Sequence, residues 1–213
     1  MRWNLYLITE EKLSNGRKTL EIVREAAAGG VDVIQLREKK MGLHQRYHLG
    51  LKVKEITDRG GITLIVNDRV DLALALDAHG VHLGQKDMPL PAAREIMGEN
   101  KIIGISVSTV DEARRAEEHG ADYLGVGAVY ETDSKNVNND RAGIGAERIN
   151  EIDRVVNIPI IAIGGLDISN VHSVIKNGAD GIAVISALTK ADNIEKKTRK
   201  FKEKILELKK GVK

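Results

Sequence analysis

The chain has 213 residues, and its 33 Lys and Arg residues nearly balance 31 Asp and Glu residues, which gives a formal net charge of +2 at pH 7. That balance provides no broad positive field, so we expect no nucleic-acid partner, and the absence of Cys excludes disulfides and thiolate metal sites. The first residues lack the pattern of a secretion signal and no apolar run approaches the roughly 20 residues of a membrane span, so we expect a cytoplasmic protein with no membrane partner.

Short runs rich in β-branched residues alternate with helical patterns along the whole chain. In chain order the runs predict strands at Asn4–Thr9, Val33–Arg37, Thr63–Asn67, Gly80–Leu83, Ile102–Ser106, Tyr123–Gly127, Ile158–Ile163 and Gly181–Ile185. The helical patterns between them include Thr19–Ala28, Leu43–Arg59, Val110–His119 and Ser169–Asn177, and Ile194–Lys209 predicts a closing helix.

The alternation of these elements indicates the fold class. A glycine that ends a helix before a short loop explains the repeated Gly-Ala-Asp at residues 120–122 and 178–180. Eight βα units within 213 residues favour a compact barrel over an open doubly wound sheet. We therefore expect the α/β class and a (β/α)8 TIM barrel with a parallel eight-stranded sheet, as a single catalytic domain over residues 1–213.

The second predicted strand ends in polar residues spaced two apart. Because side chains alternate along a strand, Gln35, Arg37 and Lys39 project to one face, whereas Leu36 and Glu38 project to the other. Burying two cations without an anionic partner would cost roughly several kcal/mol per charge. The set therefore indicates either an exposed strand end or an anion site.

Catalytic residues of such barrels lie at the carboxyl ends of the strands, where this chain has further candidate site residues, most of them polar or glycine. They are Asn67, Asp68, Gln85, Asp87, Ser106, Thr132, Ser134, Lys135, Gly164, Gly165, Ile185 and Ser186. The loops after the seventh and eighth strands often bind phosphate in this fold, and a glycine pair leaves the backbone N–H groups open to an anion. Tight packing in a crowded turn is the alternative explanation of that pair.

Two carboxylates, Asp68 and Asp87, follow the third and fourth predicted strands. Alone they fit a general acid/base pair or solvated loop acids, and Asp68 suits a helix cap. Together with nearby cations they indicate a magnesium–diphosphate site, because Mg²⁺ prefers one or two carboxylates plus substrate phosphates. For His82 we expect a packed or hydrogen-bonded role rather than a catalytic one. A monophosphate site beside a diphosphate site suggests the joining of two phosphorylated molecules with diphosphate as leaving group.

Six segments resemble the thiamine-phosphate synthase family, also called thiamine-phosphate pyrophosphorylase. The resemblance runs from Leu5 to about Leu188, with the segments in order and at near-constant spacing. The segments are Gln35–Lys39, Asn67–Ala73, Gly80–Asp87, Gly120–Gly127, Ile163–Gly165 and Gly178–Ser186. The sixth loop departs from the family pattern, which commonly has Gly-Pro and a Pro-Thr pair where this chain has residues 127–135 without proline, and Glu131 and Asp133 add negative charge there.

The resemblance implies a Mg²⁺-dependent transferase that couples hydroxymethylpyrimidine diphosphate with hydroxyethylthiazole phosphate to give thiamine monophosphate and diphosphate. In the implied dissociative mechanism, diphosphate leaves before the thiazole nitrogen attacks. The implied roles are aminopyrimidine contacts for Gln35 and Asn67; diphosphate contacts and catalysis for Arg37, Lys39, Ser106 and Lys135; Mg²⁺ binding for Asp68 and Asp87; thiazole contacts for Thr132 and Ser134; and thiazole phosphate binding for Gly165, Ile185 and Ser186.

Two other functions stay open at this stage. A thiazole tautomerase on the same barrel would need a proton-transfer residue but not the full diphosphate set, and the presence of Arg37, Lys39, Asp68, Asp87 and Lys135 argues against it. A non-catalytic thiamine phosphate-binding barrel is disfavoured by the intact Mg²⁺ set. The expected partners are the two small-molecule substrates, and the protein is expected to be a monomer or a homo-oligomer.

Overall fold

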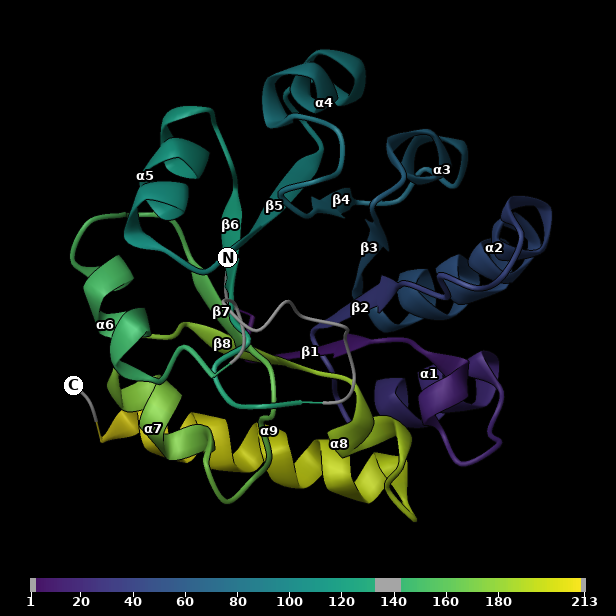
Figure 1. The fold of residues 1–213 in the computed structure, drawn as a ribbon. Coiled ribbons are helices and arrows are strands. Elements are labelled where there is room, and N and C mark those ends of the chain that lie inside the picture. The colour runs from purple at the N-terminus through teal and green to yellow at the C-terminus, as the bar shows by residue number, and fades with distance from the viewer. Residues whose placement is uncertain (1–2, 133–142, 212–213) are drawn as a thin grey trace.

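A computed structural model describes residues 3–132 and 143–211 of the chain. Within these residues, eight parallel strands form a closed barrel in which each strand pairs with the next and β8 pairs with β1 (Figure 1). The strands are β1 (Leu5–Ile8), β2 (Val33–Leu36), β3 (Thr63–Asn67), β4 (Gly80–Leu83), β5 (Ile102–Val107), β6 (Tyr123–Val126), β7 (Ile160–Ile163) and β8 (Gly181–Val184). The predicted TIM barrel is confirmed.

Helices surround this barrel (Figure 1). They are the 3₁₀-helix η1 (Glu11–Leu13) and the α-helices α1 (Thr19–Ala28), α2 (Leu43–Gly60), α3 (Val70–Ala75), α4 (Leu90–Met97), α5 (Val110–Glu118), α6 (Glu147–Asp153), α7 (Val171–Lys176), α8 (Ser186–Thr189) and α9 (Ile194–Lys210). No helix in the described part of the chain has the length and apolarity needed to cross a membrane.

Alternate residues of each strand pack in two separate layers. On β1, Leu5 and Leu7 belong to the layer between strands and helices, whereas Tyr6 and Ile8 point into the barrel. The inner layer consists of Trp3, Tyr6, Ile8, Val33, Ile65, Tyr123, Ile161, Ala183 and Ile185. Full burial of an aliphatic side chain stabilises the folded state by about 1.5–3 kcal/mol. Because side chains alternate along a strand, a shift of one residue would exchange the side chains of the two layers, so burial fixes which side chains point into the barrel.

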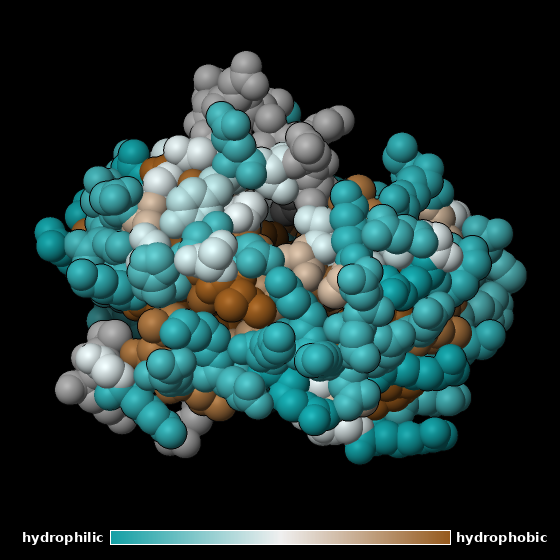
Figure 2. Space-filling model, turned by 90° about the horizontal axis from the view of Figure 1, so that it is seen from below, coloured by the Kyte–Doolittle hydropathy of each residue, from teal (hydrophilic) through white to brown (hydrophobic). Residues whose placement is uncertain are grey.

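The closing helix α9 lies along one side of the barrel and packs against α1 and α7. Its apolar residues Ile194, Phe201 and Ile205 are buried in the outer layer. Its Lys and Glu residues are partly or fully exposed, and Figure 2 shows this side of the molecule as mainly hydrophilic, with hydrophobic areas near its centre and toward its lower left and lower right. The amphipathic pattern therefore seals the barrel from water, as the sequence predicts.

Most predicted boundaries agree with the structure to within one residue, and two differ by two residues for local reasons. The strand predicted from Ile158 begins at Ile160, because Pro159 has no N–H to donate to a ladder. The helix predicted over Ser169–Asn177 is Val171–Lys176, since Asn170 Oδ1 accepts a hydrogen bond from Asp167 N and holds a turn there.

Candidate active site at the mouth of the barrel

A cavity of about 730 Å³ opens at the carboxyl ends of the strands. Its wall includes residues from Leu13 of η1 to Lys190 after α8, so residues far apart in the sequence share one space. The predicted site residues on its wall are Lys39, Asp87, Ser106, Thr132, Gly165, Ile185 and Ser186, accompanied by Gln85 and Gly164. The predicted Ser134 and Lys135 lie outside the described residues.

Two predicted site residues lie in the barrel interior rather than on this wall. Gln35 and Asn67 are only 2% and 3% exposed. Gln35 Nε2 donates a hydrogen bond to the Tyr6 hydroxyl at 2.7 Å. Within the described residues, the buried Asn67 Nδ2 has no hydrogen-bond partner. A buried amide donor in this state is suited to an acceptor supplied by a ligand.

Arg37 forms a buried ion pair that the sequence did not reveal. Its Nη1 lies 2.5 Å from Oε2 of Glu10, and both side chains are almost fully buried. Thr9 Oγ1 also accepts a hydrogen bond from the Arg37 backbone N–H at 3.1 Å. The loop after β1 thus supplies the anionic partner that a buried arginine needs. The exposed strand end is therefore wrong for Arg37, whose side chain is buried, whereas the anion site stays a prediction.

Lys39, Asp68 and Asp87 form a second charged group, from the ends of β2, β3 and β4. Lys39 Nζ lies 2.7 Å from Asp68 Oδ2, and the carboxyl groups of Asp68 and Asp87 are in hydrogen-bonding contact. Burial raises the pKa of Asp68, but hydrogen bonds with Lys39 and Asp87 outweigh burial and hold that pKa below its ordinary value. Burial is the main cause that raises the pKa of Asp87; the Gly84 N–H opposes this rise and Asp68 adds to it.

The backbone of Asp68 shows why the sequence alternative of a helix cap is wrong. Helix α3 has Arg69 at its N-cap and no side-chain cap. Asp68 adopts φ 63°, a left-handed conformation that Asp tolerates better than most residues, and its N–H donates to the His82 carbonyl at 2.9 Å. This turn keeps the Asp68 carboxylate beside Lys39 and Asp87 instead of over the start of α3.

His82 makes hydrogen bonds with both ring nitrogens. Its Nδ1 lies 2.9 Å from the Tyr123 hydroxyl, and its Nε2 lies 2.8 Å from Ser106 Oγ. The expected hydrogen-bonded role of His82 is confirmed.

The glycine pair after β7 packs against the loop after β6. That loop runs beside β7, with Val129 N and Tyr130 N donating to the carbonyls of Ile163 and Gly164 at 2.9 and 3.1 Å. A Cβ on Gly165 would lie 2.7 Å from the Glu131 carbonyl oxygen, and Gly165 also has φ +62°. The packing explanation therefore holds for Gly165, which nevertheless lines the cavity.

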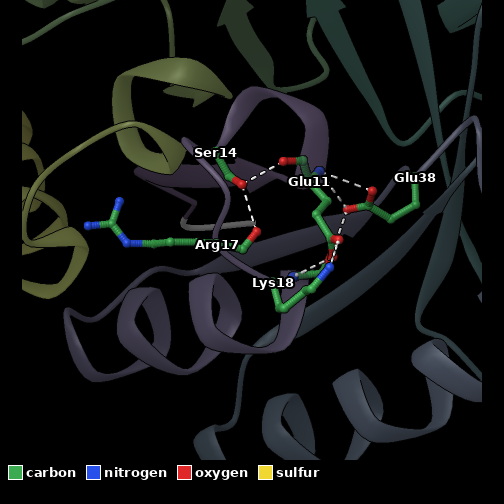
Figure 3. A network of polar contacts seen from close by, with 6 residues as sticks. Glu11, Ser14, Arg17, Lys18 and Glu38 are labelled. Carbon is green, nitrogen blue, oxygen red and sulfur yellow. Dashed lines mark hydrogen bonds and ion pairs between the residues drawn. The ribbon is translucent and has the colours of Figure 1, made fainter.

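A polar network shapes the loop between β1 and α1 (Figure 3). The buried Glu38 carboxylate accepts hydrogen bonds from Glu11 N at 3.0 Å and from Thr19 Oγ1 at 2.8 Å. Glu11 in turn lies 2.8 Å from Lys18 Nζ. Glu38 thereby positions η1, whose last residue Leu13 lines the cavity. The sequence predicted that Glu38 projects to the face opposite Arg37 and Lys39, but it did not predict the partners of Glu38.

Sequence reasoning also missed two cationic residues on the cavity wall, Lys86 and Lys190. Lys86 belongs to the turn after β4, and Lys190 follows the short helix α8. Both are exposed lysines in a chain with 33 Lys and Arg residues, so nothing in the local pattern separates them from ordinary surface residues.

The closed parallel barrel, with carboxylates, lysines and glycines gathered at the carboxyl ends of its strands, has the arrangement of a TIM-barrel enzyme. A family model described as "Thiamine monophosphate synthase" matches residues 5–188. Thiamine-phosphate synthase of Haloquadratum walsbyi is 53% identical over 196 residues, covering 92% of this chain and 88% of that protein. The protein of the same name from Moorella thermoacetica is 47% identical over 202 residues, or 95% of either chain.

A solved structure, thiamine phosphate pyrophosphorylase from Pyrococcus furiosus, superposes with a TM-score of 0.89 at 42% identity and covers 97% of both chains. The chain belongs to the thiamine monophosphate synthase family, and it is a transferase of thiamine biosynthesis.

Proposed function

We propose that this enzyme couples hydroxymethylpyrimidine diphosphate with hydroxyethylthiazole phosphate in a Mg²⁺-dependent reaction. The C–O bond between the pyrimidine methylene and the diphosphate breaks, a C–N bond to the thiazole nitrogen forms, and diphosphate and thiamine monophosphate are released. The observation that supports this most directly is one cavity whose wall joins Lys39 and Asp87 with the glycine pair and Ser186.

The carboxylate pair suits Mg²⁺. Asp68 and Asp87 place two hard oxygen donors in contact, and the raised pKa of Asp87, caused by burial and by Asp68, reflects a need for positive charge there. In the described residues no group of three or more His, Cys, Asp and Glu side chains is arranged to hold a metal. Mg²⁺ needs no such group, because substrate phosphates and water complete its coordination. When bound, Mg²⁺ would neutralise charge that develops on the leaving diphosphate.

The side chains around the carboxylates would hold the diphosphate and the pyrimidine. Lys39 reaches the wall with its side chain 46% exposed, so its ammonium group can serve Asp68 and a phosphate oxygen together. Glu10 Oε2 pairs with Nη1 of Arg37, so other N–H groups of this guanidinium can donate to a phosphate. We propose that Gln35 and Asn67, in the barrel interior, contact the aminopyrimidine, since the buried Asn67 amide nitrogen has no acceptor among the described residues.

The opposite part of the wall would hold the thiazole phosphate. Gly165, Ile185 and Ser186 meet there at the ends of β7 and β8, and Thr132 lies beside them on the cavity wall. Backbone N–H groups at a loop and a helix start are suitable donors to a phosphate. Ser134 and Lys135 remain predictions from the family resemblance.

The test is a coupling assay with purified protein and both precursors, with and without Mg²⁺. We expect release of diphosphate and formation of thiamine monophosphate, and neither product when one precursor or Mg²⁺ is omitted. Isomerisation of a thiazole phosphate without coupling would indicate the tautomerase, and binding without chemistry would indicate the binding protein.

A further inference from the structure

A continuous chain of hydrogen bonds crosses the barrel interior and ends at the cavity. Gln35 Nε2 donates to the Tyr6 hydroxyl at 2.7 Å, and the hydroxyls of Tyr6 and Tyr123 are 3.0 Å apart. The chain continues through His82 to Ser106, which lines the cavity. We call these five residues, Gln35, Tyr6, Tyr123, His82 and Ser106, the interior chain.

The hydrogen bond that Gln35 donates sets the direction of the other hydrogen bonds in the interior chain. An amide nitrogen only donates, so the Tyr6 hydroxyl accepts from Gln35 and itself donates a hydrogen bond to the Tyr123 oxygen. Tyr123 then donates to Nδ1 of His82, which leaves the proton of a neutral imidazole on Nε2. That Nε2–H donates to Ser106 Oγ, which leaves the proton of the Ser106 hydroxyl for an acceptor that enters the cavity.

The reverse direction would leave a buried polar group unsatisfied. With Gln35 Nε2 donating, the Tyr6 hydroxyl would receive a second donor from Tyr123 and keep a proton without an acceptor among the described contacts. Such a group costs roughly 1–3 kcal/mol. Burial raises the pKa of Tyr6 and Tyr123, so both phenols retain the protons that the chain requires.

The backbone makes room for this arrangement. A Cβ on Gly104 would lie 2.1 Å from the Tyr123 ring, and a Cβ on Gly125 would lie 2.9 Å from the His82 ring. Glycines on β5 and β6 therefore allow two large polar side chains to fill the interior between strands.

We infer that Tyr123 and His82 are positioning residues that fix Ser106 as a hydrogen-bond donor to an anionic oxygen in the cavity. The inference rests on the proposed function for the identity of that oxygen, which belongs to the diphosphate. A serine hydroxyl held as a donor meets a phosphate oxygen without rotating or losing another partner, so its contribution is preorganised.

The first test measures the tautomer of His82 and needs no activity. Protein with ¹⁵N-labelled histidine is studied by NMR at neutral pH, and the His82 signals are assigned by their loss in His82→Gln. We expect a neutral ring with the proton on Nε2. A proton on Nδ1 alone would overturn the inference, because Ser106 would then donate to His82, as it could if the Gln35 amide were turned.

The second test asks whether Tyr123 acts through Ser106. Tyr123→Phe removes one oxygen and keeps the ring, and we expect kcat and the affinity for inorganic diphosphate with Mg²⁺ to fall about tenfold, the effect of one charge-assisted hydrogen bond. In a Ser106→Ala background the same change should alter both quantities less than about twofold. Equal losses in both backgrounds would overturn the inference.

Four variants separate a positioning role from general damage to the fold. Tyr6→Phe breaks the interior chain one step earlier and should act in the same direction, which keeps the test valid if Tyr123→Phe fails to fold. His82→Gln, which retains an N–H donor, should keep more activity than His82→Leu. Tyr47→Phe on α2 is the matched control and should change neither quantity.

If the parent enzyme does not couple the precursors, the proposed function fails, while the tautomer of His82 and the affinity for diphosphate still decide this inference.

Discussion

The two sides of the cavity are built by different means. On the side of β2 to β4, Lys39 and Asp87 line the cavity; together with Arg37 and Asp68, which do not line it, they form a set that we call the charged wall and that is organised by contacts among side chains. On the side of β6 to β8, the glycine wall, Gly164, Gly165 and Ile185 are organised by backbone packing and hydrogen bonds. The charged wall is therefore sensitive to single charges, and the glycine wall is sensitive to added volume.

The difference suits the two proposed substrates. A diphosphate with Mg²⁺ concentrates charge, so the residues around it need counter-charges that hold them in place before the ligand arrives. A neutral ring with one phosphate needs a close backbone approach and a shaped space, which small residues provide. The following variants test whether the division holds, in order of decreasing expected effect.

The largest effect is expected when the buried ion pair of the charged wall is broken. Glu10→Gln leaves the buried Arg37 guanidinium without its counter-charge, which should cost about 3–5 kcal/mol in the free energy of unfolding. Urea denaturation measures this loss. Asp77→Asn, which removes one charge from the exposed pair with Lys101, is the control and should leave stability nearly unchanged. Similar effects of the two variants would show that Glu10 does not organise the charged wall.

A second variant removes a proposed metal ligand without adding volume. Asp87→Asn should raise the Mg²⁺ concentration needed for half-maximal coupling by about 10- to 100-fold, because a neutral amide replaces a hard anionic ligand. The unfolding transition should change little. Asp71→Asn is the matched control, since Asp71 pairs with Arg69 at the surface near Asp68. An unchanged Mg²⁺ requirement in Asp87→Asn would remove this residue from the metal site.

The glycine wall is tested by a pair of glycines with similar backbone conformation. Gly165 and Gly30 both have positive φ, +62° and +88°, but only a Cβ on Gly165 meets other atoms within 4 Å. Gly165→Ala should therefore destabilise the protein by about 1–2 kcal/mol more than Gly30→Ala, through contact with the loop after β6. It should also weaken thiazole phosphate binding, which calorimetry measures. Equal destabilisation would mean that backbone conformation alone requires Gly165.

The smallest effect concerns the pH dependence of the carboxylate pair. The raised pKa of Asp87, caused first by burial, means that its protonated form favours the folded state. Its contribution to stability is present below the ordinary Asp pKa and is lost as the pH rises through its folded value. Asp68→Asn should lower the pKa of Asp87, because one of its causes, the neighbouring carboxylate, is gone. A ¹³C NMR titration measures the pKa of Asp87 in both proteins. An unchanged pKa in Asp68→Asn would show that the two carboxyl groups do not interact.

The sequence predicted the strands well because their signal is local. Short runs rich in β-branched residues mark β1 to β8, and the burial of both layers agrees with those runs. Active sites of such barrels lie at the carboxyl ends of the strands, and this general property correctly placed Lys39, Asp87, Ser106 and Ser186 together at the mouth of the barrel. Helix ends were less certain, as at α7, since a side-chain turn competes with the helix there.

By itself, then, the sequence determined the barrel, its order of strands and the residue types at its mouth, because periodicity and spacing are properties of a single segment. The tertiary structure decided the pairing of Arg37 with Glu10, the support of η1 by Glu38, the crowding at Gly165 and the interior chain from Gln35 to Ser106. Each of these joins side chains from different strands or loops. Closure of the barrel fixes the stagger and rotation of its strands, and only that closure determines which distant groups come within hydrogen-bonding distance.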